Sequence, residues 1–393
     1  MQRKINTTIS DDSKKTTLIA VLLFVVALAL RYVSLPYTNL DMILAYGNWY
    51  DHIQALGFWR GLAGEFSNYT PPYIYLLDLA MFLGRAISKL TVMKLIPVVF
   101  DLASALIVYN IVRIKQAQKV ALFASMIFLL APTVIMNGAF WGQIDSLYTT
   151  FLLLCIYFIL TKRPWWAIAF FGISFSIKAQ AVFLAPLLLI LTLKRRIPWQ
   201  AYLLVPPIYF VMMLPAIFAG RPVLDTLLVY LHQAGELHSL SMNAPTWYAF
   251  FPKSAYDVVT GPGLALSACL VLIWVYLSVR RNVELTTEWI LFLALVSVAL
   301  VPFFTPKMHD RYFYPADVFS IVLVFYMPDM WRIPIAYQLI SLLAYMPFLF
   351  FLPAGILLPL AVVINTAALG FLLWKQWVMT KQGVKDISVK NVQ

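Results

Sequence analysis

The chain has 393 residues, of which 62% are hydrophobic and only 12% are charged, and its formal net charge is +12. Apolar runs recur from residue 16 to residue 375, and a membrane span needs about 20 mainly apolar residues, so the composition excludes a water-soluble enzyme and predicts an all-α polytopic membrane protein. The basic residues form short clusters at the ends of the apolar runs, which is the positive-inside pattern and gives no reason to expect nucleic acid as a partner.

Twelve apolar segments are predicted to cross the membrane. In chain order they are residues 16–35, 93–112, 120–136, 144–160, 165–177, 181–193, 199–218, 258–279, 288–304, 315–328, 333–350 and 355–375. The first is interpreted as a retained span, because no small-residue cleavage site follows it. We therefore expect a single integral-membrane domain over residues 1–393 with about 12 transmembrane helices.

The orientation of these spans depends on whether residues 73–86 cross the membrane. If they lie on the surface, 19 of the 29 Lys and Arg residues are cytoplasmic, whereas only 12 are if they cross. Because a Lys/Arg excess marks the cytoplasmic side, the surface location is preferred. Both termini (1–15 and 376–393) are then cytoplasmic, and two long loops, 36–92 with interfacial helices and 220–256, are extracytoplasmic.

The first polar motif is Asp41, five residues after Pro36, at the head of a segment rich in aromatic and apolar residues. Such a segment is typical of an interfacial helix. A carboxylate at its head can act as a general base toward a sugar hydroxyl. The alternative is a helix cap, since Asp is a preferred N-cap residue. Tyr69, in the turn Asn68-Tyr-Thr-Pro-Pro72, belongs to the same loop.

The second motif, Trp141-Gly-Gln143-Ile-Asp145, comes just before a predicted span. Tryptophan at a membrane interface is typical of the aromatic belt, so Trp141 alone indicates little. Gln143 and Asp145 place polar groups where an apolar helix should begin. Asp145 either caps that helix or orients an acceptor or a neighbouring cation.

The third motif is Lys178-Ala-Gln180, between two short spans. Basic clusters flank the stretch 162–196, and a single helix of that length would be about 50 Å long, so we expect two short helices that turn at Lys178 near the outer surface. Snorkelling of the lysine is the simplest interpretation, but it does not account for Gln180.

The fourth motif places three potential cations and a carboxylate within five residues, Lys307 to Arg311. Charges beside membrane spans are costly unless they find a partner. Lys307, His309 and Arg311 are candidates to neutralise a phosphate, with arginine giving the directional fork contact. Asp310 would hold or space these cations, and Tyr312 follows directly. All four motifs lie on the outer face, which predicts a single site there.

No metal cofactor is expected, although a metal requirement stays open. His232, Glu236 and His238 do not share one helical face, and HExxH is absent. Asp101 and Asp317 fall within predicted spans. They are proton-relay candidates in a transporter, or else they are paired inside the helix bundle.

With these motifs in view, the chain resembles the GT-C superfamily of membrane glycosyltransferases, which use lipid-linked sugars. The nearest branch is the bacterial relatives of the second mannosyltransferase of GPI-anchor synthesis. The resemblance rests on Asp41, Tyr69-Thr-Pro-Pro72, Trp141-Gly-Gln-Ile-Asp145-Ser, Lys178-Ala-Gln180 and Met308-His-Asp-Arg-Tyr312, and it runs from Asp41 to about Pro315. Two departures stand out: His-Asp-Arg-Tyr where the family usually has His-Glu-Arg-Tyr, and Lys-Ala-Gln where Lys-Pro-Gln is common.

The resemblance implies a GT-C-type bundle in the cell membrane and inverting transfer of a hexose, with mannose expected. The donor would be a polyprenyl-phosphate sugar, the acceptor an extracytoplasmic glycan or glycolipid, and the base Asp41. Lys178, His309 and Arg311 would bind the donor phosphate, with Lys307 as a further candidate. The residues expected to contact or support the substrates are Trp141, Gln143, Asp145, Gln180, Asp310, Tyr312 and Tyr69. The alternative function is transport or flipping of lipid-linked saccharides.

Overall fold

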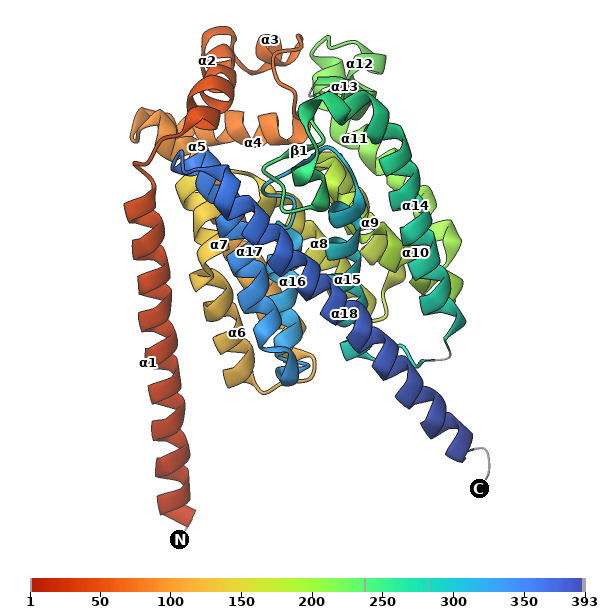
Figure 1. Cartoon of the computed structure of the whole chain (residues 1–393). Helices are drawn as coiled ribbons and strands as arrows, with labels where there is room; N and C mark the ends of the chain where they lie inside the picture. The colour runs from red at the N-terminus through yellow and green to blue at the C-terminus, as the bar shows by residue number, and fades with distance from the viewer. Residues whose placement is uncertain (1, 237, 282, 391–393) are drawn as a thin grey trace.

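In the computed structural model, long apolar helices run side by side and several short helices lie across one end of them (Figure 1). The structure describes residues 2–236, 238–281 and 283–390. The α-helices are α1 (Gln2–Ser34), α2 (Gly47–Leu56), α3 (Phe58–Leu62), α4 (Pro71–Met81), α5 (Lys89–Arg113), α6 (Gln118–Leu130), α7 (Pro132–Ile135), α8 (Asp145–Leu160), α9 (Pro164–Ile177), α10 (Ala185–Leu193), α11 (Val205–Phe218), α12 (Val223–Leu227), α13 (Val229–Glu236), α14 (Tyr256–Arg280), α15 (Thr287–Phe304), α16 (Tyr314–Val324), α17 (Arg332–Leu349) and α18 (Ala354–Lys390).

Tighter or wider helical turns extend and connect these helices. They are η1 (Met42–Tyr46), η2 (Phe82–Arg85), η3 (Met136–Trp141), η4 (Ala179–Leu184), η5 (Trp199–Leu204), η6 (Trp247–Phe250), η7 (Lys253–Ala255) and η8 (Pro328–Met330). Two strands of two residues each are also present, β1 (Ser241–Met242) and β2 (Met308–His309).

Seven helices of the described chain are long and apolar enough to cross a membrane, and the bent pair of α6 with α7–η3 raises this number to eight. Four shorter apolar helices complete the bundle: Asp145–Leu160, Pro164–Ile177, Ala179–Leu193 and Tyr314–Val324. Each of the predicted spans coincides with one of these helices or with the bent pair, so the polytopic helical architecture is confirmed. Because the four shorter helices fall below the usual length of a span, the count of about 12 crossings stays a prediction.

Residues 35–88, between α1 and α5, form a cap of short helices over one end of the bundle. Figure 1 shows α4 lying across that end, so residues 73–86 do not run through the bundle. Proline fits the first turn of a helix because its missing N–H has no partner there, and α4 begins with Pro71 and Pro72. The first turn of α1 and the last turns of α18 lie at the opposite end (Figure 1).

A broken helix carries Trp141 to the cap. The helix of residues 118–130 and the helix of residues 132–141 meet at an angle of 51°, where Pro132 cannot donate to the helical ladder. The second part ends at Gly142, whose φ of 87° favours glycine. A Cβ atom at Gly142 would also stand only 2.8 Å from the side chain of Met42. The chain therefore brings residues 141–143 directly against the start of the cap.

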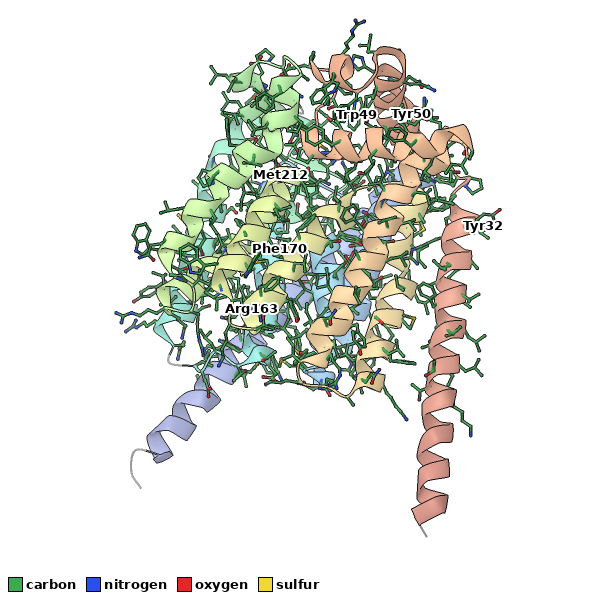
Figure 2. All side chains as sticks on the ribbon, turned by 180° about the vertical axis from the view of Figure 1, so that it is seen from behind. Tyr32, Trp49, Tyr50, Arg163, Phe170 and Met212 are labelled. Atoms are coloured by element: carbon green, nitrogen blue, oxygen red, sulfur yellow. The ribbon has the colours of Figure 1, made fainter. Side chains whose placement is uncertain are left out.

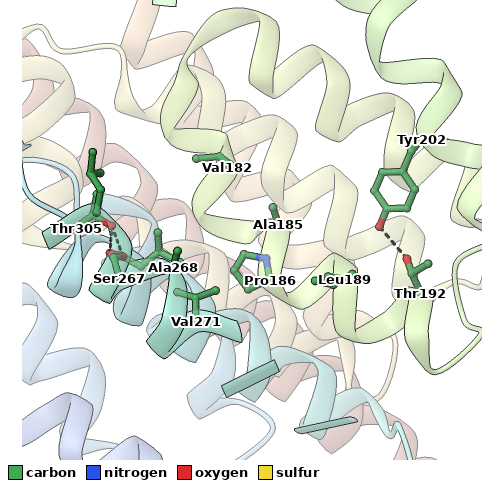
Figure 3. A pocket seen from close by; sticks show the side chains of 12 residues that line it. Val182, Ala185, Pro186, Leu189, Thr192, Tyr202, Ser267, Ala268, Val271 and Thr305 are labelled. Carbon is green, nitrogen blue, oxygen red and sulfur yellow. Dashed lines mark hydrogen bonds between the residues drawn. The ribbon is translucent and has the colours of Figure 1, made fainter. Parts of the chain in front are cut away.

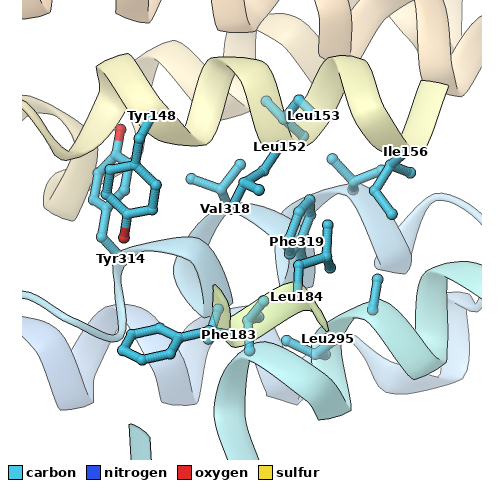
Figure 4. Packing of buried hydrophobic residues seen from close by; sticks show 14 of the residues in the cluster. Tyr148, Leu152, Leu153, Ile156, Phe183, Leu184, Leu295, Tyr314, Val318 and Phe319 are labelled. Atoms are coloured by element: carbon cyan, nitrogen blue, oxygen red, sulfur yellow. The ribbon is translucent and has the colours of Figure 1, made fainter. Parts of the chain in front are cut away.

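The core behind this region is apolar and well filled. Figure 4 shows Leu152 and Ile156 of α8 facing Val318 and Phe319 of α16, with Leu184 of η4 beside them. All five side chains are buried. Both α8 and α16 begin at a polar motif, so this packing fixes the positions of two parts of the predicted site.

The strands are a departure from the all-α prediction. β1 and β2 pair in parallel, with Ser241 opposite Met308 and Met242 opposite His309. The backbone N–H of Lys307 donates to Leu240 O over 2.7 Å, and that of Asp310 donates to Met242 O over 2.9 Å. The connection between α11 and α14 is thereby joined to the segment between α15 and α16. Alternating hydrophobicity needs more residues than two per strand to be visible in a sequence.

Candidate active site

One cavity of about 430 Å³ brings together parts of all four polar motifs. The predicted site residues in its lining are Asp41, Tyr69, Gln143, Lys178, Gln180, His309, Asp310, Arg311 and Tyr312. Trp141, Asp145 and Lys307 are not in the lining. The expectation of a single site is therefore matched by a single cavity beneath the cap.

Asp41 enters this cavity from the helical turn that precedes η1. Its Oδ2 accepts hydrogen bonds from Trp141 Nε1 over 2.9 Å and from Gln143 Nε2 over 2.6 Å. Within the described residues, no hydrogen bond reaches Oδ1. The capping alternative is wrong, because the Asp41 side chain makes no capping bond and Asn39 Oδ1 instead accepts from the N–H of Met42 over 3.2 Å.

Gln143 extends the hydrogen-bond network that holds Asp41. Its Oε1 accepts from the hydroxyl of Tyr46 over 3.1 Å and lies 3.5 Å from that of Tyr69. Tyr46 and Gln143 are buried, so the network is fixed by packing as well as by its hydrogen bonds. The carboxylate of Asp41 is thus oriented by groups from the cap and from the end of η3.

Lys178 lies at the turn between α9 and η4 and is 7% exposed. It does not snorkel: its Nζ donates to Asp145 Oδ1, and the rings of Tyr69, Tyr148 and Tyr312 surround it at 5.5 to 6.0 Å. An ammonium group has three donors, and only this one bond uses them within the described part of the chain.

Asp145 begins α8 directly after the N-cap residue Ile144, and its carboxylate accepts no backbone N–H within the described residues. It is fully buried, and besides Lys178 it accepts from Asn137 Nδ2 over 2.9 Å. The alternative that Asp145 orients a neighbouring cation is thus the one that the geometry supports. A buried carboxylate of this kind holds Lys178 at the cavity wall without occupying the cavity itself.

Arg311 has N–H groups without a hydrogen-bond partner within the described residues. Its nearest carboxylate contacts, Nε to Asp145 Oδ2 and Nη1 to Asp310 Oδ1, are both 3.8 Å long, which exceeds a hydrogen bond. The guanidinium instead lies over the ring of Trp141, 5.6 Å from its centroid. Burial disfavours its charge, but nearby groups, of which Asp145 is one, outweigh burial and raise the pKa of Arg311 further above its usual range. It is therefore a permanent cation facing the cavity.

Burial shifts the pKa of His309 and that of Asp310 in opposite directions. Burial, together with the charges of Arg311 and Lys178, holds the pKa of His309 well below its usual range. Burial raises the pKa of Asp310 to about 7, even though Arg311 opposes this shift. The neutral form of the imidazole is therefore favoured, and Asp310 titrates near neutral pH.

Lys307 is held away from the cavity. Its backbone φ is 66°, and its Nζ donates to Ala234 O while lying 5.2 Å from the ring centroid of Tyr256. Its expected contact with a phosphate remains a prediction without geometric support in this structure.

Sequence reasoning missed Lys94, a fully buried residue of α5. Its Nζ donates to Ser34 O over 3.2 Å, to Phe140 O over 2.6 Å, and to Tyr37 O. The three donors of one ammonium therefore join the end of α1, the start of the cap and the residue before Trp141. The only signal in the sequence is a lysine within an apolar run, because its partners are backbone carbonyls.

The buried acids of the bundle have partners. Arg31 donates to Asp101 Oδ2 over 3.0 and 3.1 Å, and Ser341 donates to Asp317 Oδ1 over 2.8 Å. The expectation that they are paired inside the bundle is met by Asp101, whose partner is a cation, whereas Asp317 bonds only to a hydroxyl and its Oδ2 has no partner within the described residues.

Within the described chain, no group of three His, Cys, Asp or Glu side chains is placed to hold a metal ion. His232 lies 3.9 Å from Glu65. The side chain of Glu236 lies outside the described residues.

The fold and this cavity define a polytopic helical membrane protein with one polar site beneath a cap of short helices. Among solved structures, the crystal structure of ArnT from Cupriavidus metallidurans bound to undecaprenyl phosphate is similar to it, with a TM-score of 0.57. The similarity covers 94% of this chain and 73% of that chain at 15% sequence identity, so it shows a common fold. No family model matches the sequence, and no curated protein matches it either.

Proposed function

We propose that this protein is an inverting glycosyltransferase that moves a hexose, with mannose the expected sugar, from a polyprenyl-phosphate donor to a glycan or glycolipid acceptor. One observation carries the proposal. One cavity holds the Asp41 carboxylate together with Lys178 and Arg311, and among the described residues one oxygen of Asp41 and several donors of the two cations have no hydrogen-bond partner. The similarity to ArnT, whose crystal structure contains undecaprenyl phosphate, supports this choice of donor.

The donor phosphate would lie against Arg311 and Lys178. Arg311 offers a planar fork of N–H groups with no hydrogen-bonded carboxylate in the way, and that fork fits phosphate oxygens. When the phosphate binds, its charge favours protonation of His309, which then adds a third cation. Preorganised cations of this kind stabilise the charge that grows on a leaving group, and such electrostatic stabilisation is often the main source of an enzyme's rate enhancement.

The lipid tail of the donor has a suitable groove nearby. A hollow of about 650 Å³ runs between α10 and α14, with Val182, Leu189 and Val271 in its lining (Figure 3). Its hydroxyls are satisfied within the protein, since Thr192 bonds to Tyr202 over 2.9 Å and Ser267 bonds to Thr305 over 2.8 Å. Val182 follows Gln180 by two residues, so the groove starts beside the cavity. We assign it to the polyprenyl chain.

The sugar would contact two buried oxygen atoms that accept no hydrogen bond from the described residues. Gln180 Oε1 and Asp310 Oδ1 receive no hydrogen bond from the residues that the structure describes. Such groups are costly unless a ligand or water supplies a donor, and sugar hydroxyls do so. The rings of Trp49 and Tyr69 also line the cavity and offer apolar faces to a sugar ring.

In the proposed reaction, the acceptor hydroxyl attacks the anomeric carbon while the bond from that carbon to the phosphate oxygen breaks. The hydroxyl proton passes to Asp41 Oδ1, and the bonding electrons leave with the polyprenyl phosphate. Attack from the side opposite the phosphate inverts the anomeric centre. Trp141 and Gln143 hold Oδ2, so that Oδ1 is oriented for the proton transfer.

The site is proposed to face the extracytoplasmic side of the cell membrane, because the Lys/Arg excess assigns both termini to the cytoplasm. Transport of lipid-linked saccharides, the alternative that Asp101 and Asp317 suggested, gains no support from Asp101. Asp101, which suggested a proton relay, is bound to Arg31.

The test is sugar transfer by the purified protein from radiolabelled polyprenyl-phosphate mannose to candidate acceptors. Asp41→Asn should lower the rate at least about a hundredfold, the usual size of a general-base effect. Asp78→Asn is a matched control, since Asp78 lies in the same connection but not in the cavity lining. Near-normal transfer by Asp41→Asn would sink the base assignment, and movement of the donor across vesicles without a new glycosidic bond would favour a flippase.

A further inference from the structure

A second polar cavity, of about 510 Å³, lies at the far end of α8 from Asp145. That helix has 16 residues and separates the two sites by about 24 Å. Four basic side chains, Lys115, Lys162, Arg195 and Arg196, and one acidic side chain, Glu284, line this cavity. They come from four separate connections between helices, so chain folding and not sequence adjacency brings the charges together.

Three of these cations have no counter-ion. Lys115 is paired with Glu288 over 2.8 Å. Lys162, Arg195 and Arg196 are exposed, and they make no ion pair or side-chain hydrogen bond within the described residues. The cavity therefore has an excess of positive charge that the protein itself does not neutralise.

Lys162 and Arg195 stand at turns whose backbone conformation is unfavourable for a residue with a side chain. α8 and α10 end in the same way, with Arg163 N donating to Phe158 O and Arg196 N to Leu191 O, both over 2.8 Å. The turns place Lys162 at φ 59° and Arg195 at φ 58°, a conformation that favours glycine. Cations stabilise helix C-termini and mark the cytoplasmic side, but neither effect requires that they converge on one cavity.

Exposed tryptophans flank the cavity. Trp165 and Trp166 follow the lining residue Pro164, and Trp199 stands two residues after the lining residue Ile197. Tryptophan gathers at the level of the lipid headgroups. Figure 2 shows Arg163, the neighbour of Lys162, well below Trp49 and Tyr50 of the cap. The opening of the cavity is thus at the level of the lipid headgroups. An anionic headgroup reaches it there, as well as a soluble anion.

We infer that this second cavity binds the phosphate of an anionic lipid headgroup, at the membrane surface opposite the proposed catalytic cavity. Phosphate suits the site because arginine and lysine donors converge on it, and basic pockets between membrane helices are known to hold such headgroups. The inference does not depend on the proposed glycosyl transfer.

The test is a titration of the detergent-purified protein with phosphatidylglycerol, followed by native mass spectrometry, with phosphatidylcholine as the neutral reference. The triple variant Lys162→Gln, Arg195→Gln, Arg196→Gln should bind phosphatidylglycerol on the order of a hundredfold more weakly, since each surface cation contributes about fivefold. Glu284→Gln should bind it severalfold more tightly, a gain that misfolding cannot imitate.

A matched control removes the same charge from the same end of the bundle. Arg163, Arg280 and Arg332 are exposed and lie outside the cavity lining, so their triple change to Gln should leave the affinity within about twofold. Equal losses in both triple variants would show a diffuse surface effect and overturn the site. Arg311→Gln should leave binding unchanged; a loss there would move the headgroup to the catalytic cavity. Glycerol phosphate binding as tightly as the lipid would overturn the lipid assignment.

Discussion

The indole of Trp141 contacts both Asp41 and Arg311. Its Nε1 donates to Asp41 Oδ2 over 2.9 Å, and its ring centroid lies 5.6 Å from the Arg311 guanidinium carbon. Trp141 is fully buried, so it is not the interfacial belt residue that its position in the sequence suggested. A single rigid ring fixes the proposed base relative to a proposed phosphate ligand.

Trp141→Phe should therefore lower the rate of sugar transfer about tenfold or more. The change removes the N–H that holds Asp41 but keeps an aromatic face for Arg311, and a hydrogen bond to a charged group contributes about 1.5–3 kcal/mol. Initial rates at saturating donor measure the effect. Trp289→Phe is the control, because Trp289 is also buried but its Nε1 has no partner in the described chain. Equal rates for the two variants would contradict the orienting role of Trp141.

Lys94→Met should destabilise the fold by about 3 kcal/mol or more, because the carbonyls of Ser34, Tyr37 and Phe140 lose their donor and each unpaired group costs about 1–3 kcal/mol. Thermal unfolding in detergent is the measurement. Lys89→Met provides the comparison, since Lys89 forms an exposed ion pair with Asp51 and lies 5.5 Å from the ring centroid of Tyr50. Each of these contacts contributes at most about 1 kcal/mol at an exposed site. A similar melting temperature for both variants would argue against Lys94 as a structural tie.

Gly142→Ala should cost about 2 kcal/mol in stability, from the left-handed backbone and from the contact of the new methyl with Met42. In the double variant Gly142→Ala, Met42→Ala, the second change relieves the contact. The combined loss should therefore be smaller than the sum of the two single losses by about 1 kcal/mol. Strict additivity would show that backbone strain alone accounts for the effect of Gly142→Ala.

Asp310 should make the stability depend on pH. Its pKa rises from the ordinary value of 3.8 to about 7 on folding, so the folded state favours the protonated acid. This contribution is complete below pH 3.8 and is lost as the pH rises to about 7, at up to about 1.4 kcal/mol per pH unit. Between pH 4 and 7, the melting temperature of the wild type should fall relative to that of Asp310→Asn. Above pH 7, the difference between the two melting temperatures should stay constant. Asp51→Asn, at an exposed site, is the control and should show the same dependence of melting temperature on pH as the wild type. If Asp310→Asn also showed the wild-type dependence, Asp310 would not titrate between pH 4 and 7.

Most of the residues that the sequence singled out line one cavity, and there is a physical reason why they could be recognised. In a chain with few charges, polar groups such as Lys178 and Gln143 at the ends of apolar runs are conspicuous. Their roles were harder to predict, because a role depends on partners far along the chain. Asp41 was equally compatible with a helix cap until the structure showed Asn39 in that place.

The partners of other residues could not be predicted from the pattern of residue types. Lys94 binds backbone carbonyls, which every residue has, and Lys307 differs from Arg311 through a local φ of 66° that turns the chain. The predicted helices came out close to the observed ones because length and hydropathy report directly on burial in a bilayer.

The pairing of β1 with β2 has a consequence for how the connection between α11 and α14 tolerates change. Its hydrogen bonds to the polar motif join backbone groups, as in Asp310 N to Met242 O. They therefore do not involve the side chains of residues 240–242. Only the pairing itself is independent of side chains, because Leu240 is buried and Met242 lines the cavity. An insertion or deletion that shifts the register of β1 against β2 by one residue would displace the segment that carries His309 and Arg311. A chimeric protein that exchanges this connection must therefore keep its length before Leu240, as well as an apolar side chain at that buried position.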